Sequence, residues 1–322
     1  MSEILNTVHR HILKDAWQII WKNKWLWVLG FFAAFWGNAG IFRVFNSLID
    51  SFGRAKGAEL GFWQRLQVAP GLNAWPSPWA VAIFIFIVAV LGFVVWITTA
   101  SRGGLIQVVS DFKKEEKASG WQALRGGTEN FWPILGLSLL GKIIGAALLV
   151  GLTALIFKFN LGVAWWLFPL YIVGFVLLAA LLIMTSFIVV YALAYVMIGR
   201  MSFGKSLNRA IDLFIKNWLI SLEMALIVYA ISFLLGLGLV VAAMILAMPL
   251  LLILVILIFL GLPMAFWAVA IPGITVFALL FLAAGAAFTT FELTVWVLLF
   301  KRLTQGGALA KLVRVFHRKE VE

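Results

Sequence analysis

Three ionisable residues lie inside otherwise apolar segments: Lys142, Glu223 and Glu292. A charge at the centre of a bilayer costs at least ~2.5 kcal/mol, so such side chains usually face other protein groups or water. Counted at about 1.5 Å per residue from the basic ends of their segments, Lys142 and Glu292 reach similar depths. We expect these two residues to form a buried ion pair. In a transporter, the two acids, Glu223 and Glu292, would instead belong to a proton or cation relay.

Groups suited to catalysis or metal binding are few. No set of acidic residues lies near His9 and His11 in the sequence, and we expect these histidines, like His317 in the other tail, to be solvated rather than bound to a metal. The chain has no cysteine, which excludes disulfides and thiol catalysis. It also lacks a phosphate loop, a nucleophile elbow and a zinc-protease motif. We therefore predict a protein that is not an enzyme and uses no cofactor.

The composition is that of a membrane protein. Of the 322 residues, 64% are hydrophobic and only 12% are charged, whereas a soluble domain carries about 25% charged residues. Several stretches reach the roughly 20 apolar residues that cross a bilayer core. They are apolar all round, which argues against the alternating strands of a β-barrel. The sequence predicts an all-α, polytopic integral membrane bundle whose first span serves as its own insertion signal.

The net charge of +12 raises the question of nucleic-acid binding. However, 19 of the 25 basic residues fall in four groups that alternate with segments holding few, and cationic loops stay in the cytoplasm. We therefore expect an even number of spans, both termini in the cytoplasm, and a place in the plasma membrane. The partner would be anionic inner-leaflet lipid rather than nucleic acid. The groups are 10–24, 102–125, 200–216 and 301–319.

Apolar runs predict six spans. The fourth, at 34 residues, would be about 50 Å long as one helix, so we expect it to tilt strongly or to project into the cytoplasm. We expect the last two spans to be joined by a partly buried apolar hairpin that contains LLILVILIFLGLP, but four crossings within 218–300 is the alternative. The predicted spans are at about 25–41, 79–100, 133–157, 165–198, 218–246 and 273–300, and 101–131 is a cytoplasmic segment.

One pattern occurs three times: Ala, six residues, Asn, and Trp one or two positions later. Each copy precedes a pair of predicted spans, and the second span of each pair contains two adjacent hydroxyl residues. We predict three repeat units at about 1–113, 114–200 and 201–305, in one membrane domain with a basic tail at 306–322. The repeated residues are Ala16, Asn23, Trp25, Ala123, Asn130, Trp132, Ala210, Asn217 and Trp218. The hydroxyl pairs are Thr98 and Thr99, Thr185 and Ser186, and Thr289 and Thr290.

Apolar residues recur at helical spacing within 202–218, with charged residues on the other face. This predicts an amphipathic helix that lies flat on the cytoplasmic face. In each copy Ala allows close packing, Asn hydrogen-bonds where the chain turns, and Trp favours the headgroup region. Two interpretations stay open: generic interface anchors, which we favour, and a specific lipid-recognition site. Small residues at 136–151, 236–238 and 283–288 predict close contacts between helices.

Two segments, SGWQALRGGTENFWPILGLSLL (119–140) and SFGKSLNRAIDLFIKNWLISLEMAL (202–226), carry a family resemblance. They resemble prokaryotic six-span proteins of uncharacterised function, including the YciC-like family and the membrane domain attached to some glycerophosphodiester phosphodiesterases. The resemblance implies the architecture. It implies no catalytic residue, because the metal-binding Glu, Asp and His pattern of the phosphodiesterase barrel has no counterpart here.

These features lead to one expected function and one alternative. We expect a non-enzymatic multi-pass membrane protein that interacts with lipid or organises a membrane partner. The alternative is a transporter, or a lipid flippase or scramblase, with a polar path near Glu223, Glu292 and Lys142.

Overall fold

The computed structural model describes residues 7–37, 78–112, 120–160 and 168–305, and the regular elements in these ranges are α-helices, as predicted. Five of them are long and apolar enough to cross a membrane, which indicates a multi-pass membrane protein. Only the first part of the predicted span at 25–41 is described, as α2. The elements are α1 (Thr7–Lys22), α2 (Leu26–Gly37), α5 (Pro78–Asp111), α6 (Gly120–Glu129), α7 (Phe131–Asn160), α8 (Phe168–Gly199), α9 (Phe203–Phe259) and α10 (Pro263–Thr304).

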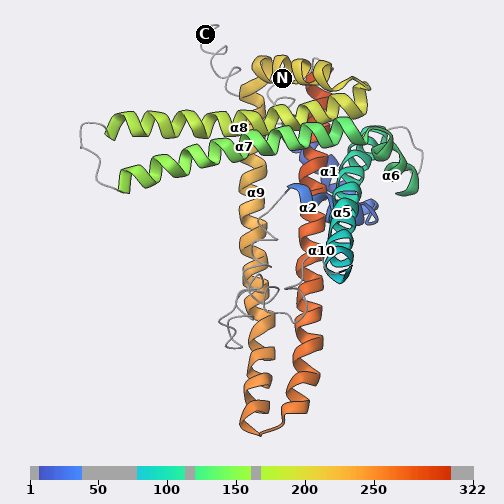
Figure 1. Cartoon of the computed structure of the whole chain (residues 1–322), viewed down its shortest axis with the longest axis vertical. Coiled ribbons are helices and arrows are strands. Elements are labelled where there is room, and N and C mark those ends of the chain that lie inside the picture. Colours follow the sequence, from blue (N-terminus) through green and yellow to red (C-terminus); the bar gives the residue numbers. More distant parts are fainter. Residues whose placement is uncertain (1–6, 38–77, 113–119, 161–167, 306–322) are drawn as a thin grey trace.

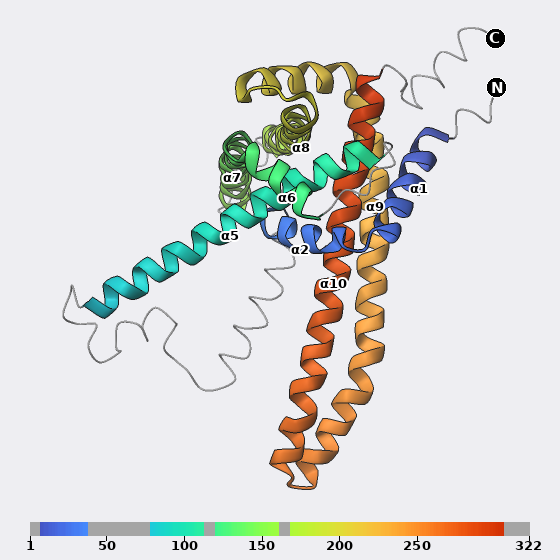
Figure 2. The same ribbon diagram turned by 90° about the vertical axis from the view of Figure 1, so that its right-hand side faces the viewer.

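The long helices form three arms that diverge from a common base (Figures 1 and 2): α5, the α7/α8 hairpin and the α9/α10 hairpin. Figure 1 shows the α7/α8 hairpin running across the view while the α9/α10 hairpin runs vertically. Figure 2 looks along the α7/α8 hairpin and shows α5 leaving the base in a third direction. The first part of α9 lies across the top of the base before this helix turns into its arm.

The packed core lies at the base, where the arms meet. It contains fully buried residues such as Leu105, Tyr191, Met224 and Leu299, each from a different long helix. Farther along the arms, large apolar side chains such as Phe175 and Met248 are exposed. An exposed apolar surface of this extent requires an apolar environment such as lipid.

The alanine of each predicted amphipathic segment is buried. Ala16 lies on α1, Ala123 on α6 and Ala210 on the first part of α9, and none is more than 2% exposed. A methyl group at these positions lets a neighbouring helix approach closely, as the sequence predicted.

Each repeated asparagine marks the place where an amphipathic segment ends. Asn23 separates α1 from α2, Asn130 separates α6 from α7, and Asn217 has non-helical angles (φ −131°, ψ 27°) within α9. The side-chain amides of Asn23 and Asn217 donate to the carbonyl oxygens of Ile19 (3.2 Å) and Leu213 (3.0 Å), four residues earlier. These bonds satisfy carbonyl groups in the last helical turn. Trp132 and Trp218 beside the breaks are exposed, and Trp25 is half-buried.

The amphipathic segments connect the arms in a closed ring. α6 packs on α5, the first part of α9 packs on α8, and α1 packs on α10. Aromatic contacts mark two of these junctions: Phe214 stacks on Phe187 (5.5 Å between ring centroids), and Trp17 meets Phe291 edge-on (6.2 Å). Each segment therefore joins its own arm to the second helix of another.

Backbones meet most closely between α5 and α6. A Cβ atom at Gly104 would overlap the carbonyl oxygen of Ala123, and one at Gly127 would overlap the carbonyl oxygen of Ala100. On α7, Gly141 and Gly145 face Val189 and Leu182 of α8, in agreement with the close contact predicted there. The corresponding prediction for Gly236 and Gly238 is wrong, since added Cβ atoms there would meet nothing within 4 Å.

The region 218–300 differs from the expected arrangement. The segment expected to form a partly buried hairpin of its own instead extends α9 to Phe259 and α10 back to Pro263, and most of its side chains are exposed. Pro249 lies inside α9, and the non-helical angles in this helix are at Asn217. Pro263 occupies the start of α10, where its missing N–H leaves no intrahelical bond unmade. Neither proline therefore ends a helix.

Replacing Gly104 or Gly127 by alanine should lower the thermal stability in detergent. Overpacking against a backbone carbonyl costs about 1 to 3 kcal/mol, which exceeds the gain of up to about 1 kcal/mol in helix propensity. Gly92→Ala is the matched control, because it lies on α5 where an added Cβ meets nothing within 4 Å. The fraction of monodisperse protein after heating measures the effect. An equal loss in all three variants would contradict the close α5–α6 contact.

Candidate functional site

A polar cavity of about 310 Å³ lies among α2, α5, α7, α8 and α10, at the base of the arms. Its lining combines two basic residues, one acid and four hydroxyl groups with apolar side chains and glycines. The polar residues are Arg102, Lys142, Glu292, Ser138, Thr185, Ser186 and Thr289.

Two of the three predicted intramembrane residues, Lys142 and Glu292, line this cavity. They come from α7 and α10, which agrees with the similar depth expected for them. Their direct pairing stays a prediction. Arg102 of α5 is a third charged residue at the site, attracted by Glu292 and repelled by Lys142.

Arg102 was missed because the sequence assigned it to a cytoplasmic segment at 101–131. The predicted end of the second span at residue 100 is too early as a helix end: α5 continues to Asp111, and α6 occupies 120–129. The helix continues because Gly103 and Gly104 pack against α6 and α7 while Leu105 and Ile106 are buried. The apolar stretch GLIQVV after Arg102 was the available signal, since a cytoplasmic loop would be more polar.

One hydroxyl group in the lining is left for a ligand or water. Ser138 is only 4% exposed, and its Oγ has no hydrogen-bond partner in the described part of the chain. The Thr185 and Thr289 hydroxyls, by contrast, donate to the carbonyl oxygens of Leu181 (2.8 Å) and Gly285 (3.0 Å). Because buried polar groups are nearly always hydrogen-bonded, the Ser138 hydroxyl requires a partner, such as water or a ligand group, that the described residues do not supply.

The charges and hydroxyl groups suit an anion. Two cations and one carboxylate give the lining a formal charge of +1, and guanidinium and ammonium groups form strong charge-assisted hydrogen bonds to phosphate or carboxylate oxygens. Among the described residues, no group of three or more His, Asp or Glu side chains gathers in a way that could hold a metal ion.

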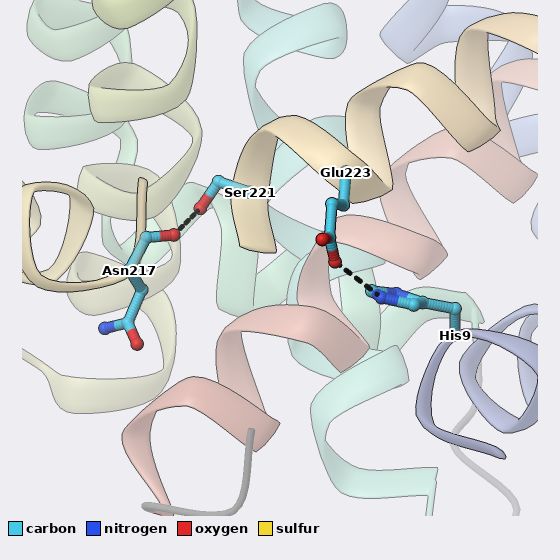
Figure 3. Close-up of polar contacts among 4 residues, drawn as sticks. All are labelled: His9, Asn217, Ser221 and Glu223. Carbon is cyan, nitrogen blue, oxygen red and sulfur yellow. Dashed lines mark hydrogen bonds and ion pairs between the residues drawn. The ribbon is translucent and has the colours of Figure 1, made fainter. Parts of the chain in front are cut away.

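Glu223 does not line this cavity. Its Oε2 lies 3.3 Å from Nε2 of His9, and both side chains are mostly buried (Figure 3). The expectation that His9 is solvated is therefore wrong: the packing of α1 against the α9/α10 arm brings the imidazole to the carboxylate. His317 lies outside the described residues. The structure thus gathers Lys142 and Glu292 and places Glu223 in a separate contact between α1 and α9.

A buried hydrogen-bond chain supports the break at Asn217. The Ser221 hydroxyl donates to the carbonyl oxygen of Asn217 (2.9 Å), as Figure 3 shows, and lies 2.7 Å from the phenol oxygen of Tyr191. Because the serine hydrogen is used on Asn217, the hydrogen between the two hydroxyls comes from Tyr191. This chain links α8 to α9 just beyond the amphipathic segment.

Glu292→Gln should lower thermal stability in detergent, because it removes the carboxylate that attracts Arg102. Adding Arg102→Gln should recover part of the loss, with a coupling of about 1 kcal/mol. A parallel cycle with Lys142→Met tests the pair predicted from the sequence. If only the double-mutant cycle of Lys142 and Glu292 shows coupling, Glu292 pairs with Lys142 rather than with Arg102. If the stability losses are additive in both cycles, there is no ionic interaction in the cavity.

Comparisons with known proteins do not identify the chain or its site. No protein-family model matches the chain, no curated protein is detectably similar to it, and no solved structure matches it. The resemblance to the six-span family therefore stays a prediction that rests on the segments 119–140 and 202–226.

Proposed function

We propose that the protein is a non-enzymatic, multi-pass membrane protein that binds the headgroup of a phosphate-bearing lipid in the polar cavity. The observation that carries this proposal is the set of two basic side chains and the unpartnered Ser138 hydroxyl in a cavity surrounded by apolar helices. A lipid phosphate would accept hydrogen bonds from all three groups.

The position of Lys142 supports access from the membrane. Its side chain lies at the cavity but is exposed, and the following residues Ile143 and Ile144 are exposed apolar residues of the same arm. A long lysine side chain at such a boundary can keep its stem against apolar surface and its ammonium group on a headgroup. The lipid would therefore reach the cavity sideways from the bilayer.

The lengths of the helices support a steeply tilted membrane position. α5 has 34 residues and is about 51 Å long at 1.5 Å per residue. A helix of this length fits wholly within a core of about 30 Å only at a tilt of about 54°, and at smaller tilts its end projects from the core. Arms that diverge as in Figures 1 and 2 require such tilts if all of them enter one flat bilayer.

The proposal includes a threefold repeat with six spans. The buried alanines, the asparagines at the three helix breaks and the ring of packing between segments support it. In this arrangement α1, α6 and the first part of α9 lie on the inner leaflet of the plasma membrane, both termini are cytoplasmic, and the basic groups favour anionic lipid. Organisation of a membrane partner is a further role for this surface.

A lipid flippase or scramblase is the second candidate, and the charged cavity itself is the observation that favours it. Headgroup passage across a bilayer requires polar groups along the route. The separate contact of Glu223 with His9 weakens a single path through Lys142, Glu223 and Glu292. We therefore rank headgroup binding first.

Phosphatidylglycerol should raise the thermal stability of the detergent-purified protein more than phosphatidylcholine does, because a ligand of the folded state stabilises it. Lys142→Met and Ser138→Ala should weaken this effect, with a roughly tenfold loss of apparent affinity for Lys142→Met, equivalent to about 1.4 kcal/mol. Thr275→Val is the matched control, since this exposed residue on α10 lies outside both the cavity and the basic groups. Equal responses of all variants would contradict headgroup binding in the cavity.

A scrambling assay in liposomes separates the two candidates. Under the proposed function, fluorescent lipid in the inner leaflet stays protected from dithionite at the level of protein-free vesicles. Rapid loss of that protection, abolished by Lys142→Met, would replace headgroup binding by the flippase or scramblase function.

A further inference from the structure

A second cavity, the tryptophan groove, lies on another face of the base. It has a volume of about 420 Å³ and is bounded on one side by Trp17, Trp21 and Trp27. The other side is formed by Ser232, Leu235, Gly236 and Leu239 of α9 and by Ala283, Ala284, Gly285, Ala287, Phe288 and Phe291 of α10. None of its lining residues belongs to the polar cavity.

Small residues keep the groove open. Gly236 faces it from α9, and Ala283, Ala284, Gly285 and Ala287 face it from α10. A Cβ atom at Gly236 would meet nothing within 4 Å. The two helices therefore leave room for an additional apolar group beside the tryptophans.

The lining of the groove is almost entirely apolar. Apart from backbone atoms and the indole N–H groups, its polar member is Ser232, whose hydroxyl donates to the carbonyl oxygen of Val228 (2.6 Å). The indole N–H of Trp27 donates to the carbonyl oxygen of Ile20 (3.2 Å). With these groups satisfied, a hydrocarbon chain is the ligand class that the walls fit.

The rim supplies a rigid aromatic wall and a cation. Trp21 contacts both Trp17 and Trp27, with ring centroids 5.5 Å and 5.4 Å apart. Nζ of Lys24 lies 5.9 Å from the Trp21 ring, and Lys22 nearby is also exposed. Tryptophan and lysine together are typical of the headgroup level of a membrane, where the cation meets lipid phosphate.

We propose that the tryptophan groove holds one acyl chain of an anionic phospholipid whose phosphate lies beside Lys24. This site is distinct from the headgroup cavity and uses α1 and α2 as its wall. The two proposed sites both lie in the membrane environment, but no side chain lines both of them.

The test uses full-length protein extracted in mild detergent, with bound phospholipid counted by native mass spectrometry after exchange into lipid-free detergent. Gly236→Leu places a side chain in the groove, where its Cβ atom meets nothing within 4 Å, and should reduce the occupancy of one retained phospholipid by at least fivefold while lipid held by the polar cavity stays bound. Gly238→Leu is the matched control: a Cβ atom at this position also meets nothing within 4 Å, and the residue lies outside the groove. This variant should retain lipid like the unchanged protein. Retention by Gly236→Leu equal to that of Gly238→Leu would overturn the proposal.

Lys24→Gln tests the binding of the lipid headgroup separately from the binding of the acyl chain. The acyl chain should still bind, but the preference for phosphatidylglycerol over phosphatidylcholine should fall severalfold. An unchanged preference would overturn the placement of the phosphate. If Gly236→Leu is not monodisperse, Trp21→Leu replaces it, and full lipid retention by that variant would equally overturn the proposal.

The cavity variants distinguish this inference from the proposed function. Lys142→Met and Ser138→Ala should leave groove lipid unchanged while weakening the response to added phosphatidylglycerol. Loss of lipid in Gly236→Leu with no effect of Lys142→Met would support the groove and reject the headgroup cavity. The reverse result would reject the groove alone.

Discussion

The close packing of each amphipathic segment on the second helix of another arm is the contact on which the rest of the structure depends. Residues far along the arms are exposed and gain little from protein contact, whereas the buried residues concentrate at the base. There, Gly104 and Gly127 bring α5 and α6 together at backbone distance. Between apolar helices in lipid, such close packing is the main source of association, because lipid tails offer as apolar a surface as the helices do.

Polar groups follow the same division between base and arms. Many hydroxyl groups in the long helices donate to a backbone carbonyl four residues earlier, as Thr99 does to Val95 (2.7 Å) and Thr275 does to Ile271 (2.7 Å). These local bonds need no tertiary partner, so such residues are tolerated anywhere along an arm. Charged side chains cannot satisfy their charge and hydrogen-bonding groups with such local bonds. Arg102, Glu223 and Glu292 accordingly lie at the base, where several helices supply partners or a cavity.

The two cavities differ because their walls differ in residue size and polarity. Serine, threonine and charged residues converge where five helices meet, and the resulting space suits an anionic group. Glycine and alanine converge between α9 and α10, beneath a wall of tryptophans, and leave a space suited to hydrocarbon. A membrane lipid carries both chemistries, which is why we propose lipid as the ligand of both cavities.

The sequence by itself determined the helical class, the apolar arms, and the positions where amphipathic segments end, because these depend on composition and on short-range periodicity. The buried Ala123 and the break at Asn217 were predictable on that basis. Only the tertiary structure decided that Arg102 joins Lys142 and Glu292, that His9 meets Glu223 across 214 positions of sequence, and that Gly236 faces open space rather than another helix. These outcomes depend on which helix faces pack together and in which direction each arm leaves the base, and an all-round apolar helix carries no pattern that specifies either.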